Sequence, residues 1–202
     1  MTEQKARPLL VIVFGLPATG KTVAAREIEM LTAGFSYFGT DTLRAEKSWQ
    51  PADHTFEKTR SLYREMFRDA AKALEDGRSA VLDATFFDAR LRSELYGYFG
   101  DLDHPIHGLW MHVDDAIAVE RIKKRGVTDE KYSGVDSAET YYRLKRIFES
   151  FAAADYTRFE CLVASSGGPS LEILHRRSSC CRFLGIVQGA LASAANRESL
   201  GS

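Results

Sequence analysis

Short apolar runs alternate along the chain with longer segments in which apolar residues recur every three or four positions. We expect strands at the apolar runs, which cover residues 9–14, 35–39, 80–82, 106–113 and 159–164. We expect helices at the periodic segments, which cover residues 21–31, 54–76, 88–99 and 115–125, with a further helix after Asp136. Strands that alternate with helices of this length form parallel sheets covered on both faces. The pattern therefore predicts an α/β fold with a five-stranded parallel sheet.

Glycines and capping residues mark several helix boundaries. Gly77 follows the apolar face of the segment 54–76, and Gly126 follows the segment 115–125, as is common after the last turn of a helix. Asp136 and Glu139 have the spacing of a capping box. They predict the start of a helix that carries Tyr141, Leu144, Phe148 and Phe151.

The last 25 residues, 178–202, do not continue this pattern. They are rich in Ser, Ala and Gly, and their periodicity is weak, so the sequence assigns no strand or helix to them. A chain of 202 residues without internal repeats fits one domain. We therefore expect one domain over residues 1–177 and an unassigned C-terminal tail over residues 178–202.

Composition and charge exclude several classes of protein. Hydrophobic residues make up 45% of the chain and charged residues 27%, which is a globular mixture and argues against disorder. The 27 basic and 28 acidic side chains nearly cancel, which argues against a protein that coats nucleic acid or an anionic membrane. The balance is uneven, because residues 121–146 hold 8 basic and 4 acidic side chains. A positive segment therefore lies within a neutral chain.

Cysteine usage and the shortness of the apolar runs predict a cytoplasmic protein. The three cysteines, Cys161, Cys180 and Cys181, are odd in number and fit no zinc site, so we expect reduced thiols. The apolar run at 9–14 is too short for a signal sequence or a membrane span. We expect no membrane contact, and the sequence leaves open whether the protein is a monomer or a homodimer.

One segment matches the nucleotide-binding motif G-x-x-x-x-G-K-[ST] in full. It follows directly after the strand predicted at 9–14 and directly precedes the helix predicted at 21–31, which is the context that this motif requires. We therefore expect ATP to bind at the phosphate loop, which consists of Gly15, Leu16, Pro17, Ala18, Thr19, Gly20, Lys21 and Thr22.

The residue types of the loop explain how it would hold a triphosphate. Glycines allow the backbone to turn its N–H groups toward phosphate oxygens, and the following helix adds the positive end of its dipole. Lys21 supplies a catalytic cation for the β- and γ-phosphates, and the Thr22 hydroxyl is a ligand for Mg²⁺. The chain has no [NT]-K-x-D segment for guanine recognition, so the expected cofactors are ATP and Mg²⁺.

Four segments in this order resemble the P-loop small-molecule kinases, a group of AAA-type ATP-binding proteins related to polynucleotide 5′-hydroxyl kinases and zeta-toxin kinases. They are the phosphate loop, Thr40-Asp41-Thr42-Leu43-Arg44, residues 82–90 and residues 119–126. They span residues 9 to about 155, and the tail lies outside the resemblance. The resemblance implies a P-loop NTPase three-layer sandwich with a helical lid, and phosphotransferase activity.

The same resemblance gives roles to two residues of the second segment. Asp41 would be the general base that accepts the proton of an acceptor hydroxyl. Arg44 would hold an anionic group of the acceptor. The alternatives are that Asp41 caps the helix that follows it and that Arg44 is a solvated surface arginine.

Asp83 follows the strand predicted at 80–82 and would bind Mg²⁺ together with Thr22, or orient the acceptor. The next residue is Ala84, whereas enzymes that hydrolyse ATP commonly carry a glutamate there to orient water. This favours transfer to a hydroxyl over transfer to water. Thr85 and Arg90 follow as expected contacts of the acceptor.

We interpret residues 121–136, a basic helix end followed by a polar loop, as a lid over the site. Arg121 and Arg125 are four positions apart and share one helix face. From the lid, either arginine would neutralise charge on the transferred phosphoryl group. Arg125 is the better candidate because it adjoins the loop. The alternative for both is a solvated basic helix face.

The sequence therefore predicts an ATP-dependent phosphotransferase that moves the γ-phosphate of Mg-ATP to a hydroxyl of a small-molecule or nucleotide acceptor. It does not identify that acceptor, and a nucleic-acid end is not favoured. The alternative is a P-loop ATPase or a nucleotide-binding regulatory protein without an acceptor substrate.

Overall fold

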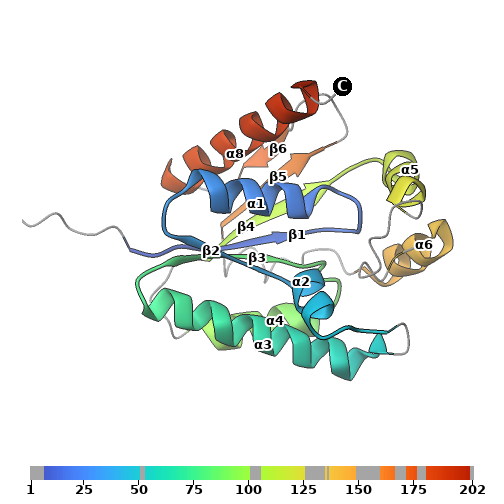
Figure 1. Cartoon of the computed structure of the whole chain (residues 1–202), viewed down its shortest axis with the longest axis horizontal. Coiled ribbons are helices and arrows are strands. Elements are labelled where there is room, and N and C mark those ends of the chain that lie inside the picture. The colour runs from blue at the N-terminus through green and yellow to red at the C-terminus, as the bar shows by residue number, and fades with distance from the viewer. Residues whose placement is uncertain are drawn as a thin grey trace, which may run out of the picture.

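The computed structural model describes residues 7–50, 53–100, 106–125, 135, 137–148, 160–166, 172–176 and 181–200. Its centre is a six-stranded sheet with the order β2-β3-β1-β4-β5-β6. The strands are β1 (Leu10–Phe14), β2 (Phe35–Gly39), β3 (Ser79–Asp83), β4 (Ile106–His112), β5 (Glu160–Ser165) and β6 (Glu172–Arg176). Helices cover both faces of the sheet (Figure 1). They are α1 (Lys21–Leu31), α2 (Thr40–Glu46), α3 (Phe56–Glu75), α4 (Ala89–Phe99), α5 (Asp115–Arg125), α6 (Ala138–Ile147) and α8 (Cys181–Leu200).

The first five strands run parallel, which confirms the predicted α/β class and the three-layer sandwich. The register aligns Val13 of β1 and Gly39 of β2 with Asp83 of β3, so the carboxyl ends of these strands lie at one edge of the sheet. Open parallel sheets bind their ligands at this edge. The segments that leave it are the phosphate loop, α2 and residues 84–88.

Alternate residues of β1 face two different cores. Leu10, Ile12 and Phe14 pack into the core that contains α3 and α4, whereas Val11 and Val13 pack into the core that contains α1 and α8. All five side chains are buried, because successive residues of a strand point to opposite faces and both faces are covered. The two cores thereby fix the point at which β1 ends and the phosphate loop begins.

A sixth strand, β6, extends the sheet beyond the five strands that the sequence predicts. It pairs antiparallel with β5, with Leu162 opposite Arg176 and a shift in register between Val163 and Ala164. The sequence of β6 begins and ends with a charged residue, so it lacks the continuous apolar run of a buried strand. The prediction of a sheet with five strands is therefore incomplete, although its five parallel strands are confirmed.

The segment to which the sequence assigns no element contains the long helix α8, which packs beside α1 on one face of the sheet (Figure 1). Small residues also occupy exposed positions of this helix, and they hide its helical period from the sequence pattern. α8 nevertheless contributes to the core at positions three or four apart, which are Phe183, Val187, Ala190, Leu191 and Ala194.

The predicted lid, residues 121–136, is described only at 121–125, within α5, and at 135. The helix after it, α6, has Ser137 as its N-cap, and Ser137 Oγ accepts a hydrogen bond from the Thr140 N–H at 3.2 Å. The expected N-cap, Asp136, lies outside the described residues. Among the described helices, none has the length and apolar character needed to cross a membrane.

Candidate active site

The phosphate loop, residues 15–22, connects the end of β1 to the first turn of α1. Gly15 has a φ of 137° and Gly20 a φ of 85°, values at which side chains are strained. Gly15 also has no space for a side chain, because a Cβ there would lie 2.2 Å from the Met111 carbonyl oxygen. The two glycines therefore permit the tight turn that presents backbone N–H groups and the helix N-terminus to a phosphate.

Hydrogen bonds to three carbonyl groups fix the shape of this loop. Thr19 Oγ1 donates to the Leu16 carbonyl at 2.8 Å within the loop. Arg121 Nη1 donates to the Ala18 carbonyl at 3.1 Å, and Ser166 Oγ donates to the Thr19 carbonyl at 2.9 Å. Arg121 also donates to Ser166 Oγ and to the Ser166 carbonyl, at 2.8 and 2.7 Å. Helix α5 and the end of β5 thus hold the loop from outside.

The structure gives Arg121 contacts other than those expected of a lid residue. The sequence predicts a catalytic lid residue, but the guanidinium is engaged with Ala18 and Ser166 and does not line the cavity at the phosphate loop. Arg125, one turn further along α5, does line that cavity. Arg121 lies one turn closer to β4, where the loop carbonyls accept its hydrogen bonds. The two arginines therefore have different contacts although they share one helix.

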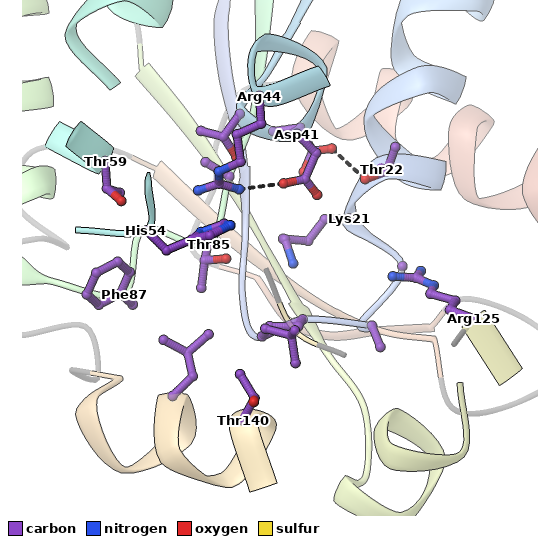
Figure 2. Close-up of a pocket in the computed structure, with 18 of the residues that line it drawn as sticks. Lys21, Thr22, Asp41, Arg44, His54, Thr59, Thr85, Phe87, Arg125 and Thr140 are labelled. Carbon is purple, nitrogen blue, oxygen red and sulfur yellow. Dashed lines mark hydrogen bonds and ion pairs between the residues drawn. The ribbon is translucent and has the colours of Figure 1, made fainter. Parts of the chain in front are cut away.

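Lys21 projects into the centre of the site (Figure 2). Its Nζ donates to the Leu16 carbonyl at 2.8 Å. Burial lowers the pKa of Lys21, and the nearby carboxylates of Asp83 and Asp41 oppose this shift. The ammonium group is therefore a cation in a poorly solvated position, where its attraction to a phosphate is stronger than in water.

Thr22 and Asp83 form the pair that the sequence predicts for magnesium. Thr22 Oγ1 donates to Asp83 Oδ2 at 2.6 Å. Asp83 is the last residue of β3 and is 5% exposed. Burial raises the pKa of its carboxyl, while the Lys21 charge and the hydrogen bonds from Thr22 and Tyr37 lower it. A hydroxyl and a carboxylate beside the phosphate loop are oxygen ligands of the kind that Mg²⁺ prefers, so these residues fit the ion.

Tyr37 of β2 belongs to the same cluster, and the sequence does not reveal it. Its hydroxyl donates to Asp83 Oδ2 at 2.9 Å. Burial and the Asp83 charge raise the pKa of Tyr37 well above its ordinary value, so the phenol remains protonated and donates this hydrogen bond. The strand pattern shows only that Tyr37 lies in an apolar run. The contact depends on the pairing of β2 with β3.

Asp41 and Arg44 lie on α2, directly after β2. Arg44 Nη1 donates to Asp41 Oδ1 at 2.5 Å. The Asp41 side chain is 54% exposed and the Arg44 side chain only 14%. Gly39 is the N-cap of α2, so the capping alternative for Asp41 is wrong. The solvated alternative for Arg44 is also wrong, since its guanidinium lies 5.5 Å from the centroid of the Trp49 ring.

A single cavity of about 560 Å³ joins the phosphate loop to these residues. Asp41 and Arg44 lie on one side of Lys21, Arg125 lies on another side, and Thr140 of α6 lies opposite Asp41 (Figure 2). Ligand cavities span about 300–1,000 Å³, so this volume suits a small molecule. The predicted site residues that line it are Pro17, Ala18, Gly20, Lys21, Thr22, Asp41, Arg44, Asp83, Thr85 and Arg125.

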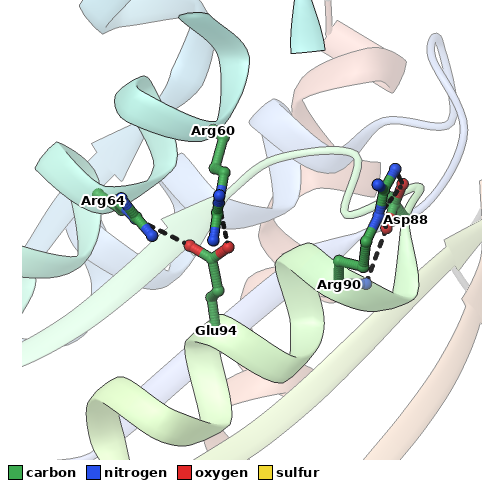
Figure 3. Close-up of polar contacts among 5 residues, drawn as sticks. All are labelled: Arg60, Arg64, Asp88, Arg90 and Glu94. Atoms are coloured by element: carbon green, nitrogen blue, oxygen red, sulfur yellow. Dashed lines mark hydrogen bonds and ion pairs between the residues drawn. The ribbon is translucent and has the colours of Figure 1, made fainter. Parts of the chain in front are cut away.

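Arg90 does not line this cavity, so the structure does not bring it together with the other residues predicted to contact the acceptor. Asp88, the N-cap of α4, accepts hydrogen bonds from the Arg90 N–H at 2.7 Å and from Arg90 Nη2 at 2.6 Å. The Arg90 side chain is 70% exposed and lies over the Phe56 ring. Figure 3 shows this pair on α4 near Glu94, which accepts from Arg60 and Arg64. The Arg90 side chain thus contacts Asp88 and Phe56 outside the cavity.

Residues that the sequence does not predict complete the wall of the cavity. Helix α6 contributes Thr140, Arg143, Leu144 and Ile147, which share one helix face because they are three or four positions apart. The periodicity of this helix is visible in the sequence, but its orientation toward the phosphate loop is not. Three more lining residues, which face them from the side of α3 and β3 (Figure 2), are His54, Thr59 and Phe87.

His54 is the titratable residue among these additions. Burial, with a contribution from the Arg44 charge, lowers the pKa of His54 below its ordinary value. Its ring also packs edge-on against Trp49, with 5.5 Å between the centroids. A neutral imidazole therefore faces the cavity at pH 7, and it can both donate and accept a hydrogen bond.

A central parallel strand that ends in such a loop, with a lysine and a hydroxyl–carboxylate pair beside it, defines the P-loop nucleoside-triphosphate-binding class. The chain belongs to the AAA domain family AAA_33, whose family model matches residues 10–150. This match confirms the resemblance drawn from the four sequence segments. No curated protein matches the chain.

Solved structures with a similar fold include several kinases. A gluconokinase from Sinorhizobium meliloti 1021 has a TM-score of 0.56 at 15% identity, with 96% of each chain covered. A sugar kinase from Janibacter sp. HTCC2649 has a TM-score of 0.58 at 15% identity, covering 77% of this chain and 84% of that chain. Kti12 from Chaetomium thermophilum, in complex with ADP-AlF3, has a TM-score of 0.59 at 17% identity, covering 78% and 89%. The chain therefore has the fold of the P-loop kinases.

Proposed function

We propose that the protein is an ATP-dependent kinase that transfers the γ-phosphate of Mg-ATP to a hydroxyl group of a small-molecule or nucleotide acceptor. The observation that carries the proposal is that Lys21 of the phosphate loop and Asp41 of α2 line one cavity. A γ-phosphate held at the loop would therefore face a carboxylate that can accept a proton. The proposal includes action in the cytoplasm, as a monomer or a homodimer.

On the nucleotide side, the backbone of the phosphate loop and the N-terminus of α1 would bind the phosphates. Lys21 would contact the β- and γ-phosphate oxygens, and Arg125 would neutralise charge on the transferred group. Mg²⁺, held by Thr22 and Asp83, would withdraw charge from the same oxygens. Arg121 supports this side indirectly, because it holds the Ala18 carbonyl of the loop.

On the acceptor side, Asp41 would act as the general base. The acceptor oxygen forms a bond to the γ-phosphorus, the bond from that phosphorus to ADP breaks, and the acceptor proton passes to Asp41. Arg44 already binds Asp41 Oδ1, so it would orient the carboxylate and leave Oδ2 for the acceptor hydroxyl. Arg44 and Thr85 line the cavity beside Asp41 and would contact the acceptor itself.

The lining of the acceptor side supports one kind of acceptor. Phe87, Leu144 and Ile147 form apolar parts of the wall, and Ile147 is 54% exposed. Apolar side chains in a cavity gain free energy when a ligand covers them. We therefore propose an acceptor that has a ring or hydrocarbon face beside its hydroxyl, in place of a fully polar polyol. Its further polar groups would meet the hydroxyls of Thr59, Thr85 and Thr140.

The alternative, an ATPase without an acceptor, has less support. The residue after Asp83 is Ala84, which lines the cavity and is buried. Its methyl group cannot orient a water molecule for attack on the γ-phosphate.

The experiment is incubation of the purified protein with γ-labelled ATP, Mg²⁺ and a set of acceptors. The set contains gluconate and glucose as polyols, and nucleosides and aromatic alcohols as molecules with an apolar face. We expect labelled product and ADP in equal amounts with a member of the second group. Steady release of phosphate without any labelled acceptor would contradict the kinase and favour the ATPase. Labelling of the polyols alone would keep the kinase but reject the apolar acceptor.

A further inference from the structure

Tyr37 connects β2 to the residues expected to hold magnesium. The Tyr37 hydroxyl donates to Asp83 Oδ2 at 2.9 Å, and Thr22 Oγ1 donates to the same oxygen at 2.6 Å. Within the described part of the chain, Asp83 Oδ1 receives no hydrogen bond. Two hydroxyl groups therefore fix one oxygen of a buried carboxylate and leave the other oxygen available.

Two neighbours on α1 hold the Tyr37 side chain and backbone in this position. The Arg26 guanidinium lies 3.5 Å from the centroid of the tyrosine ring. Glu29 Oε1 accepts the Tyr37 backbone N–H at 3.3 Å. Tyr37 thus joins helix α1 to the carboxylate at the end of β3.

Gly39 provides the space that the Tyr37 hydroxyl occupies. A Cβ at Gly39 would lie 2.1 Å from the hydroxyl oxygen and 2.6 Å from Cζ of the ring. The backbone does not itself require a glycine there, because Gly39 has a φ of −123° and a ψ of 138°, which any residue can adopt. The close approach of the tyrosine is therefore the reason that a side chain does not fit at this position.

We infer that Tyr37 is a positioning residue for the magnesium–nucleotide site. Together with Thr22 it fixes Asp83 Oδ2, and so it holds the carboxylate in the orientation that leaves Oδ1 for the metal ion or a water bound to it. Removal of a group that hydrogen-bonds to a metal ligand commonly weakens metal binding about 10- to 100-fold. The inference rests on the proposed function, of which it uses only the binding of nucleotide and Mg²⁺.

The test is the Mg²⁺ dependence of ADP binding, measured by isothermal titration calorimetry. Wild-type protein and Tyr37→Phe are titrated with ADP without metal and at increasing Mg²⁺. We expect both to bind metal-free ADP equally well, and Tyr37→Phe to require roughly 10- to 100-fold more Mg²⁺ for its full gain in affinity. The matched control is Tyr98→Phe on α4, an exposed tyrosine, which should behave as the wild type.

A second variant disturbs the contact between Tyr37 and Asp83 by a change at Gly39. Gly39→Ala should displace the tyrosine and raise the Mg²⁺ requirement about as much as Tyr37→Phe does. Tyr37→Leu and the double variant Gly39→Ala/Tyr37→Leu should then have equal Mg²⁺ requirements, because the new methyl group no longer has a ring to displace. Thermal unfolding of each variant verifies that it is folded.

The outcomes separate this inference from the kinase proposal. A wild-type Mg²⁺ requirement in Tyr37→Phe would overturn the inference alone. Equal weakening of metal-free and Mg²⁺-supported ADP binding would also overturn it, since the tyrosine would then have a general structural role. A wild-type protein that binds no nucleotide would overturn both the inference and the proposed function.

Discussion

The two sides of the cavity are built in different ways. The phosphate side comes mainly from one continuous stretch, residues 15–22, whose backbone depends on Gly15 and Gly20. The acceptor side comes from α2, α3, α6 and the segment after β3, which are separate elements between residues 40 and 147 of the chain. Phosphate groups are alike in every nucleoside triphosphate, so a backbone loop can bind them. A particular acceptor needs a particular set of side chains, and only the folded chain assembles that set.

The acceptor side nevertheless has a rigid part of its own. Phe86 has a φ of 50°, a value that costs free energy in a residue other than glycine. Its N–H donates to the Tyr63 hydroxyl at 3.0 Å, and its carbonyl accepts from Arg92 Nη1 at 3.0 Å. Both partners are buried. These two bonds hold the backbone between Thr85 and Phe87, and both of these residues line the cavity.

The largest effect is expected on the phosphate side, from Lys21→Ala. Loss of the ammonium removes the cation between the loop and the two carboxylates, so we expect phosphoryl transfer to fall roughly 10³-fold or below detection. The measurement is transfer of labelled phosphate to the acceptor found in the screen. Lys124→Ala, which removes an exposed lysine of α5, is the matched control and should retain activity. Near-normal transfer in Lys21→Ala would show that the loop is not the site of the reaction.

The next effect separates the two sides directly. Asp41→Asn keeps the shape of the side chain but removes the base, so we expect kcat to fall roughly 10²-fold. ADP binding, measured by calorimetry, should stay near that of the wild type, because the phosphate side is unchanged. An equal loss of ADP affinity would assign Asp41 to nucleotide or metal binding, and Asp41 would then belong to the phosphate side of the cavity.

A smaller effect is expected from the apolar wall. Leu144→Ala removes a half-buried side chain from the α6 face of the cavity. Covering a leucine contributes about 1.5–3 kcal/mol, so we expect KM for the acceptor to rise roughly tenfold when part of that contact is lost. KM for ATP should not change. Leu31→Ala, at an exposed position of α1, is the control. A rise in KM for ATP alone would place Leu144 on the nucleotide side.

The smallest effect on activity is expected from Tyr63→Phe, which acts on the rigid part of the acceptor side. The change leaves the buried Phe86 N–H without its acceptor, so we expect the free energy of unfolding to fall by about 1–3 kcal/mol. Activity should fall only through a several-fold higher KM for the acceptor. Urea unfolding and steady-state kinetics provide the two measurements. An unchanged stability would show that water or another group replaces the tyrosine hydroxyl.

Local patterns predict the phosphate side well. The motif at 15–22 lies between β1 and α1, as its sequence context indicates, and α1, β2 and α5 have the predicted bounds. Each of these features depends on residues close together in the chain, through apolar runs, helical spacing or glycines at positive φ. The sequence did not predict α8, because its alanines, glycines and serines differ too little in hydropathy to show which positions of the helix are buried.

The acceptor side is predicted less well, and the reason is also physical. Arg121 and Arg125 look alike in the sequence, but one binds the Ala18 carbonyl and the other lines the cavity. Arg90 has the expected position in the chain, but the N-cap Asp88 binds its guanidinium. Which partner a long side chain finds depends on groups that other elements bring near it, and no spacing rule contains that information.

By itself, the sequence determined the class of the fold, the phosphate loop and its ligand chemistry, because backbone angles, strand burial and helix periodicity depend on residues close together in the chain. Only the tertiary structure decided that Tyr37 and Thr22 share one oxygen of Asp83, that α6 faces α2 across the cavity, and that α8 packs beside α1. Each of these contacts joins residues far apart in the sequence. The register of the sheet and the packing of the two cores determine how close these residues lie, and both depend on the whole fold.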